Sequence, residues 1–156
     1  MITFRKAEMM DIPELVRLRI EFLTLLNKDF KCTTDFSDEL FNYFNENMKV
    51  DTFTAWIAFD DAKIVGTSGI CFYTLPPSVS NFTGKTAYIM NMYTMVQYRN
   101  QGIASKLFEK VVYEAKSRGC KKIYLHATES GRPLYKKFGF KETNNEMVYN
   151  TDLLRM

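Results

Sequence analysis

Apolar and polar positions alternate along this chain with two different periods, which predict its helices and strands. Alternating or continuous apolar runs predict strands at 2–5, 52–59, 64–75, 86–96 and 122–126. Apolar residues spaced three and four apart predict helices at 12–25, 35–49, 103–118 and 131–138. A last pair of short strands is predicted near 140–141 and 147–150. Asp11 is placed to cap the first helix, with Pro13 in its first turn.

The run 86–96 is apolar on both of its alternating faces, with Asn91 as its one buried amide. A strand buried on both sides lies in the middle of a sheet with helices on each face. The strand, helix and strand of residues 86–126 predict a parallel pair with a right-handed crossover. We therefore expect an α/β fold, and one domain over residues 1–156.

Composition narrows the class of protein. The 156 residues are 46% hydrophobic and 25% charged, as in a globular protein, and the net charge of +3 comes without the clustered basic residues that nucleic-acid binding requires. Three separated cysteines and one histidine make a metal site unexpected. The sequence shows no apolar leader and no run of transmembrane length, so we expect a cytoplasmic protein without membrane contact.

A polar turn separates the apolar strand 86–96 from the helix 103–118, and it carries the pattern Arg99-x-x-Gly102-x-Ala104. Free N–H groups at a helix start bind anions, so those from Gln101 to Ser105 can point at a diphosphate. The alternative is an ordinary polar β–α connection. Neither a Walker phosphate loop nor an early G-x-G-x-x-G is present.

A second stretch follows about thirty residues later, with Leu134-Tyr135 on a short helix and then the turn Phe138-Gly139-Phe140. Together, and in this order, the two motifs resemble those of the GNAT (GCN5-related N-acetyltransferase) superfamily. The resemblance implies a mixed, mostly antiparallel central sheet in which one parallel strand pair splays apart. It also implies acetyl-CoA as acyl donor and no metal.

The resemblance assigns roles to residues at the matching positions. Met95 and Val96 would bond the pantetheine arm through their backbone, and a backbone N–H near Met95 would meet the oxyanion. Tyr135 would be the general acid that returns a proton to the CoA thiolate, although a packed aromatic is the competing interpretation. The full set expected to bind acetyl-CoA is Met95, Val96, Arg99, Asn100, Gln101, Gly102, Ile103, Ala104, Ser105 and Ser130.

The sequence departs from the family pattern at three positions. Thr128 and Gly131 stand where members often have Asn and Ala, and Gln97 stands where many have Pro. None of these changes removes a side chain that the chemistry requires, but they affect secondary contacts around the cofactor.

Residues that handle the acceptor are harder to predict. Candidates for a general base are Glu21, Glu46, His126 and the strand face of Asn91 and Tyr93. We expect Glu21, Asn91 and Tyr93 at the substrate, although solvated surface is the simpler interpretation of Arg17, Arg19 and Glu21. Asn91 can also serve a structural hydrogen bond.

The expected function is direct transfer of acetyl from acetyl-CoA to a primary amine, on a small molecule or a peptide. A non-catalytic acyl-CoA-binding module on the same fold is the alternative. The aromatic-rich strands make a homodimer conceivable. The acceptor itself has no recognisable motif.

Overall fold

The computed structural model describes residues 1–143 and 145–152. Contacts along the chain divide it into two compact units, Met1–His126 and a second that begins at Ala127. We describe each unit by itself.

The first unit is built on a five-stranded sheet in the order β1-β2-β3-β4-β5. Neighbouring strands are antiparallel except β4 and β5, which are parallel. The predicted mixed sheet with one parallel pair is thus confirmed. The strands are β1 (Ile2–Lys6), β2 (Phe53–Asp60), β3 (Lys63–Thr74), β4 (Lys85–Thr94) and β5 (Lys122–Leu125).

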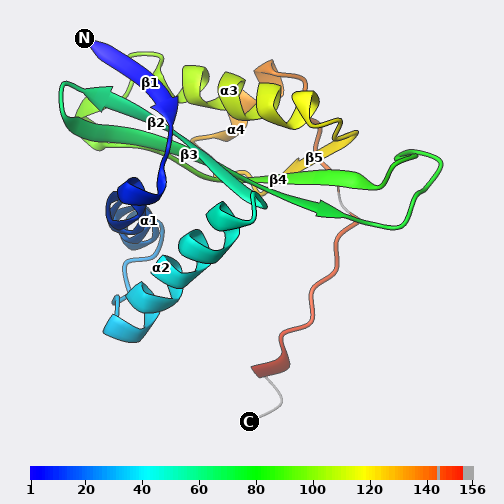
Figure 1. Ribbon diagram of the computed structural model, residues 1–156, viewed down its shortest axis with the longest axis horizontal. Coiled ribbons are helices and arrows are strands. Elements are labelled where there is room, and N and C mark those ends of the chain that lie inside the picture. The colour runs from blue at the N-terminus through cyan, green and yellow to red at the C-terminus, as the bar shows by residue number, and fades with distance from the viewer. Residues whose placement is uncertain (144, 153–156) are drawn as a thin grey trace. The chain divides into compact units, whose positions relative to one another are not determined.

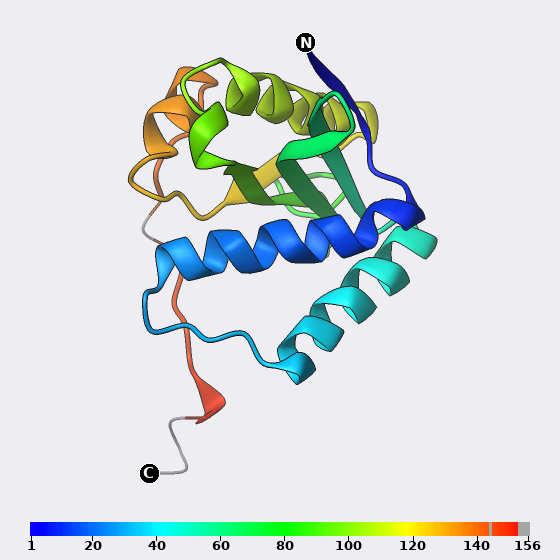
Figure 2. The same ribbon diagram turned by 90° about the vertical axis from the view of Figure 1, so that its left-hand side faces the viewer.

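Helices cover both faces of this sheet, as the doubly apolar β4 predicted. Helices α1 (Ile12–Leu26) and α2 (Thr34–Lys49) lie on one face and α3 (Ile103–Ser117) on the other, in both views (Figures 1 and 2). Two short 3-10 turns, η1 (Met9–Asp11) and η2 (Val96–Tyr98), precede α1 and follow β4. The predicted boundaries differ from the observed ones by one or two residues at most ends.

The core follows from the apolar stripes of the helices. Leu15 and Leu18 of α1, and Leu107 of α3, are almost completely buried. Phe44 of α2 packs on Phe53 of β2 with ring centroids 5.2 Å apart. Burying each side chain of this size contributes about 1.5–3 kcal/mol, so these stripes fix the helices to the sheet.

Asp11 is the N-cap residue of α1 as expected, but its side chain makes no capping bond to the helix. Its carboxylate instead accepts the Glu8 N–H at 2.7 Å and pairs with Arg5 at 2.7 Å. The Arg5 guanidinium lowers the pKa of Asp11. The carboxylate of Asp11 is therefore bound within η1 and by Arg5, and it is not available to the first turn of α1.

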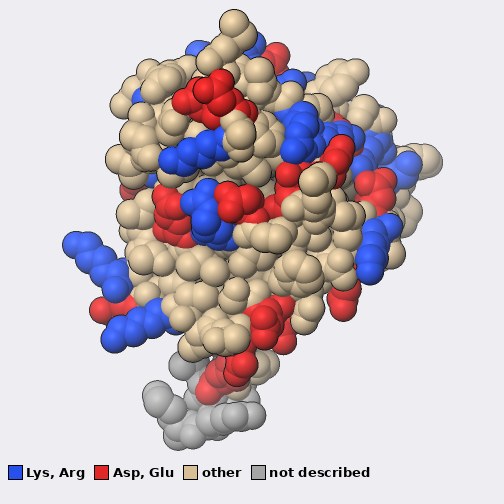
Figure 3. Space-filling view, turned by 60° about the vertical axis from the view of Figure 1, so that its left-hand side comes forward, with Lys and Arg blue, Asp and Glu red and all other residues tan. Residues whose placement is uncertain are grey.

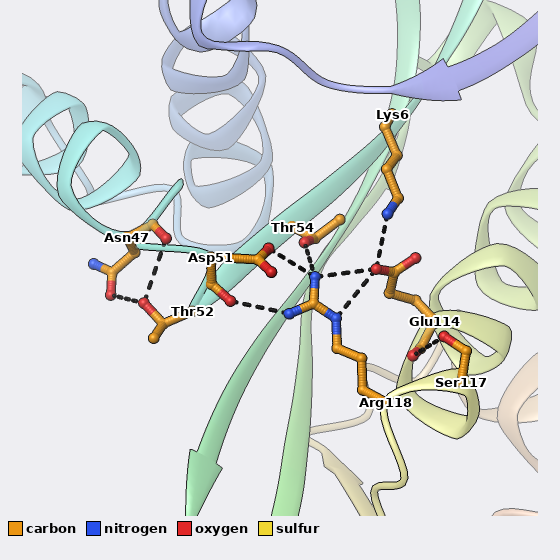
Figure 4. Close-up of polar contacts among 8 residues, drawn as sticks. All are labelled: Lys6, Asn47, Asp51, Thr52, Thr54, Glu114, Ser117 and Arg118. Atoms are coloured by element: carbon orange, nitrogen blue, oxygen red, sulfur yellow. Dashed lines mark hydrogen bonds and ion pairs between the residues drawn. The ribbon is translucent and has the colours of Figure 1, made fainter. Parts of the chain in front are cut away.

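A polar network joins the carboxyl end of α3 to the edge strand β1 and to the start of β2 (Figure 4). Buried Glu114 pairs with Lys6 at 2.8 Å and with Arg118 at 3.1 Å. Arg118 also donates to Asp51 at 2.8 Å and to Thr54 at 3.0 Å. Each charged group of this network therefore has a partner of opposite charge. The network fixes the carboxyl end of α3 against β1 and β2.

The second unit contains α4 (Arg132–Lys137), which confirms the predicted last helix in a shorter form. Gly139, at φ +94°, ends it, and the Phe140 N–H bonds back to the Tyr135 carbonyl. The strand pair predicted near 140–141 and 147–150 is wrong: the described residues there form no strand. Met147 and Tyr149 alternate as a strand would, but both are exposed, and alternation without a pairing edge does not make a strand.

Candidate functional site

The central strand β4 carries a bulge at Asn91. The register between β3 and β4 shifts between Thr67 and Gly69, and Asn91 takes the left-handed conformation at φ +56°. Asparagine tolerates this region better than most residues, which explains an amide at this point of an otherwise apolar strand. The bulge bends the strand between its two halves.

The parallel pairing of β4 and β5 stops just before the bulge. Its last pair is Ile89 with Leu125, although β4 continues to Thr94. Within residues 1–126, the edge of β4 that faces away from β3 is therefore unpaired over residues 90–94. This is the splayed parallel pair that the resemblance implied.

Two buried polar atoms on the unpaired half of β4 lack a hydrogen-bond partner among the described residues: Asn91 Oδ1 and Thr94 Oγ1. A buried polar atom without a partner costs about 1–3 kcal/mol. A water molecule, an ion or a polar ligand can complete the bonding of such an atom. The segment of β4 from Asn91 to Thr94 is therefore chemically suited to receive one.

The backbone after β4 differs in detail from the expectation. The Met95 N–H donates to the Val65 carbonyl at 2.9 Å, and the Met95 carbonyl accepts the Tyr98 N–H at 2.8 Å. The Met95 amide thus belongs to the sheet and cannot donate to an oxyanion at the same time. Val96 is exposed, and among the described residues its N–H has no backbone partner. Of the N–H groups of Met95 and Val96, that of Val96 is therefore the one still able to donate to an oxyanion.

The polar turn before α3 has the geometry of an anion-binding site. Asn100 and Gly102 both have positive φ, at +62° and +78°, and Gly102 is the N-cap of α3. No side chain caps this helix, and its first backbone bond runs from the Lys106 N–H to the Gly102 carbonyl. Among the described residues, the N–H groups of Ile103, Ala104 and Ser105 are therefore unbonded at the positive end of a 15-residue helix.

A Cβ built on Gly102 meets no atom of the described residues within 4 Å, so the space over the turn is open with respect to them. Arg99 is exposed beside it and holds the turn to the strand by donating from Nε to the Thr94 carbonyl at 3.0 Å. Gln101 and Asn100 are exposed as well. The expected cofactor residues from Arg99 to Ser105 thus lie together in this turn and in the first turn of α3, and Met95 and Val96 precede them just after β4.

Two of the three expected substrate residues are brought into contact. The Tyr93 hydroxyl on β4 donates to the Glu21 carboxylate on α1 at 2.6 Å. Burial, and then the bond to Glu21, raise the pKa of Tyr93 to about 12. Arg17 pairs with Glu21 at 3.3 Å, and Arg99 stands 5.8 Å from the Tyr93 ring centroid. This polar cluster links α1 to the turn before α3.

The other base candidates lie elsewhere. Glu46 is exposed on α2, and His126, just after β5, is hydrogen-bonded to Tyr88 near the start of β4. Sequence reasoning also missed Arg17 as the partner of Glu21. The signal was available, since the two residues are four apart on one helix.

The second unit explains two departures from the family pattern. A Cβ at Gly131 would stand 2.8 Å from the Tyr135 hydroxyl, so a glycine lets this ring pack on the backbone. Thr128 accepts the Gly131 N–H through Oγ1 at 3.2 Å and stabilises the start of α4. Ser130 is exposed, with its hydroxyl 3.3 Å from that of Thr128. Burial raises the pKa of Tyr135.

Several other site types find no support. On the face drawn in Figure 3, Lys and Arg side chains are interspersed with Asp and Glu and form no basic stripe. Over residues 1–143 and 145–152, no three His, Cys, Asp or Glu side chains are grouped as a metal ion would need. In the same part of the chain, no helix has the length and apolar character needed to cross a bilayer.

One family model, that of the acetyltransferase (GNAT) family, matches this chain over residues 19–140, a stretch that contains the bulged strand β4 and the glycine turn before α3. The chain belongs to the acetyltransferase (GNAT) family. The match continues past His126 into the second unit, so both units take part in the family fold. Members of this family use acetyl-CoA as acyl donor, in agreement with the cofactor expected from the sequence.

Solved structures support the same assignment. A predicted acetyltransferase from Clostridium acetobutylicum, solved with acetyl-CoA, is 38% identical and has a TM-score of 0.88. The similarity covers 100% of this chain and 99% of that one. A GCN5-related N-acetyltransferase from Ralstonia eutropha has the same TM-score at 24% identity and shows the shared fold.

Curated relatives match over smaller parts of their length. Thialysine N-epsilon-acetyltransferase of Mus musculus is 35% identical over 66 residues, which is 40% of this chain and 39% of the relative. N-acetyltransferase 8B of Homo sapiens is 27% identical over 124 residues, or 78% of this chain and 51% of the relative. The chain thus spans about half the length or less of these curated relatives.

Proposed function

We propose that this chain is an acetyl-CoA-dependent N-acetyltransferase that transfers acetyl directly to a primary amine. The observation that carries the proposal is the open anion-binding turn at the start of α3, next to the unpaired half of β4. The family assignment and the acetyl-CoA in the Clostridium acetobutylicum structure support the same donor.

The residues present fit acetyl-CoA. The unbonded N–H groups of Ile103, Ala104 and Ser105 suit the pyrophosphate, and Gly102 keeps the approach open. Arg99 adds positive charge beside them. The free edge of β4 suits the amide groups of the pantetheine arm, which can pair with it as a strand would.

When bound, acetyl-CoA supplies the thioester whose acetyl group is transferred. The chain's contribution at the amine is the Glu21 carboxylate, held by Tyr93 and Arg17. A carboxylate binds the ammonium form of an amine and can take its proton through water. Because the pKa of Tyr93 is about 12, its hydroxyl stays protonated and fixes the orientation of Glu21 at neutral pH.

We assign Tyr135 as the general acid for the departing thiolate. The assignment rests on its place in the Leu134-Tyr135 motif and on its raised pKa, which keeps the phenol protonated as a donor must be. Ser130 is proposed as a further contact to the cofactor on the motif alone.

The acceptor that we propose is a primary amine on a small molecule or a peptide. The relative named thialysine N-epsilon-acetyltransferase supports a small amino-acid-like amine. An assay of acetylation over a panel of amines, read by mass spectrometry, tests the proposal together with calorimetry of acetyl-CoA binding. We expect binding and at least one acetylated amine. Binding without any acetylated product would instead support a non-catalytic acyl-CoA-binding module, and no binding would refute both.

A further inference from the structure

Asn91 on β4 carries a buried carboxamide whose oxygen has no partner. The residue is 7% exposed, and its Oδ1 accepts no hydrogen bond from any described residue. Over residues 1–143 and 145–152, five buried side-chain polar atoms are in this condition, and three lie at or beside the bulge of β4: Thr67 Oγ1, Asn91 Oδ1 and Thr94 Oγ1. Unsatisfied polar atoms are rare in protein interiors, so their concentration here indicates a place where a polar group from outside the chain completes the bonding.

The backbone conformation of the bulge does not by itself explain this side chain. Asn91 has φ +56°, in a region that glycine adopts more readily than asparagine. Glycine would therefore form the bulge without burying an unpaired oxygen. Asp61, at φ +52°, differs because it is exposed, so that its polar atoms can bond to water. An unpaired buried polar atom on a strained backbone is costly, and backbone strain of this kind is concentrated at ligand sites.

The unpaired edge of β4 has one closed end and one open end. It is closed where pairing with β5 stops, at Ile89 and Leu125, and it is open toward the turn whose N–H groups suit the pyrophosphate. A pantetheine arm that pairs with this edge from the turn therefore has its acyl group near the closed end. Asn91 lies two residues after Ile89, so its carboxamide belongs to the acyl end of the proposed donor site.

The chemistry of a carboxamide suits the attacking nitrogen. Its oxygen accepts a hydrogen bond from an N–H group but, being neutral, does not take the proton. The proton acceptor that we propose is the Glu21 carboxylate, which Tyr93 holds from a position two residues after Asn91 on the same strand. The two side chains can therefore act on the two different N–H groups of one primary amine.

We propose that Asn91 Oδ1 accepts a hydrogen bond from the N–H that the attacking amine keeps, and that this bond makes the site select primary over secondary amines. The amine nitrogen bonds to the acetyl carbon as the bond from that carbon to the CoA sulfur breaks. One amine proton passes through water to Glu21, Tyr135 gives a proton to the sulfur, and the second N–H stays on nitrogen. A secondary amine has no second N–H to offer. The inference rests on the proposed N-acetyltransferase function and specifies its substrate class.

The test compares hexylamine with N-methylhexylamine on the wild type and on Asn91→Gly, which keeps the backbone conformation and removes the oxygen. We expect the wild type to prefer hexylamine. In Asn91→Gly, kcat/KM for hexylamine falls by about tenfold, while that for N-methylhexylamine does not fall and the KM of acetyl-CoA is unchanged. Asn91→Asp, which keeps an accepting oxygen at the same place, retains the preference. Asp61→Gly is the control matched in φ and changes neither amine.

Calorimetry of hexylamine on the CoA-bound protein separates this inference from the proposed function. We expect the affinity to be about tenfold lower in Asn91→Gly, with an unfolding free energy no lower than that of the wild type. Weaker binding in this variant without acetylation of any amine would sustain the inference and refute the transferase. Acetylation with the same preference in Asn91→Gly as in the wild type would do the reverse. An equal loss on both amines, or hexylamine neither bound nor acetylated by the wild type, would also overturn the inference.

Discussion

Tyr93 on β4 donates a 2.6 Å hydrogen bond to Glu21 on α1, although 72 residues separate them in the chain. The contact places a carboxylate at the half of β4 that does not pair with β5. It therefore joins the acceptor chemistry that we propose to the strand that we propose binds the donor.

The Tyr93–Glu21 contact predicts alkaline sensitivity. The pKa of Tyr93 is raised from 10.0 to about 12 in the folded chain, so the fold favours the protonated phenol. This stabilisation is fully present below about pH 10 and is lost as the pH rises through about 12. We expect the unfolding free energy of Tyr93→Phe to fall less over this interval than that of the wild type. Exposed Tyr113→Phe is the control, and identical alkaline slopes for all three proteins would contradict the assignment.

Gly102 and Gly119 bracket α3 and give a matched pair, because both have φ +78°. Alanine at either position is expected to cost about 1 kcal/mol in unfolding free energy through backbone strain. Only Gly102→Ala should also raise the KM of acetyl-CoA, by about tenfold, since its Cβ enters the space over the anion-binding turn. Denaturant titration and steady-state kinetics separate the two effects. A similar KM change in Gly119→Ala would show that strain in α3 alone is responsible.

Tyr135→Phe tests the general acid. Loss of the proton donor is expected to lower kcat by about 100-fold while the dissociation constant of acetyl-CoA stays the same. Tyr113→Phe again serves as control, because that ring is 72% exposed. Unchanged kcat in Tyr135→Phe would leave Tyr135 with a packing role against Gly131.

Arg118 supports the fold rather than the chemistry. Arg118→Met leaves Glu114, which is 8% exposed, with Lys6 as its remaining partner, and should lower the unfolding free energy by about 1–3 kcal/mol. Glu109→Gln, which breaks an exposed pair with Lys106, should change it by less than about 0.5 kcal/mol. Turnover per folded molecule is expected to be normal in Arg118→Met. A lower kcat at full folding would instead connect this network to the site.

The parts of the fold that sequence predicted are those determined by local pattern. The strand β4 and the helix α3 have apolar periods strong enough to be recognised in isolation. The turn between them is recognised by its polar residues and glycine, and α4 by the Leu134-Tyr135 motif. Asp11 is at the predicted N-cap position, but its carboxylate pairs with Arg5, six residues away, and makes no capping bond to the helix. The prediction of a last strand pair was wrong because alternation of apolar and polar residues does not show whether a sheet edge is available for pairing.

The site was predictable only in part. The residues of the turn from Arg99 to Ser105 are contiguous, so their proximity follows from the chain itself. The bulge at Asn91 depends on the register between β3 and β4, which no local pattern contains. The Glu21–Tyr93 contact likewise depends on how α1 packs on β4.

The most direct measurement follows both products of one reaction. The protein is incubated with acetyl-CoA and the accepted amine, and CoA thiol release and acetylated amine are quantified together. Direct transfer predicts equal amounts of the two products, with thiol release that depends on the amine. Tight binding of acetyl-CoA with no amine-dependent thiol release would contradict the proposed function.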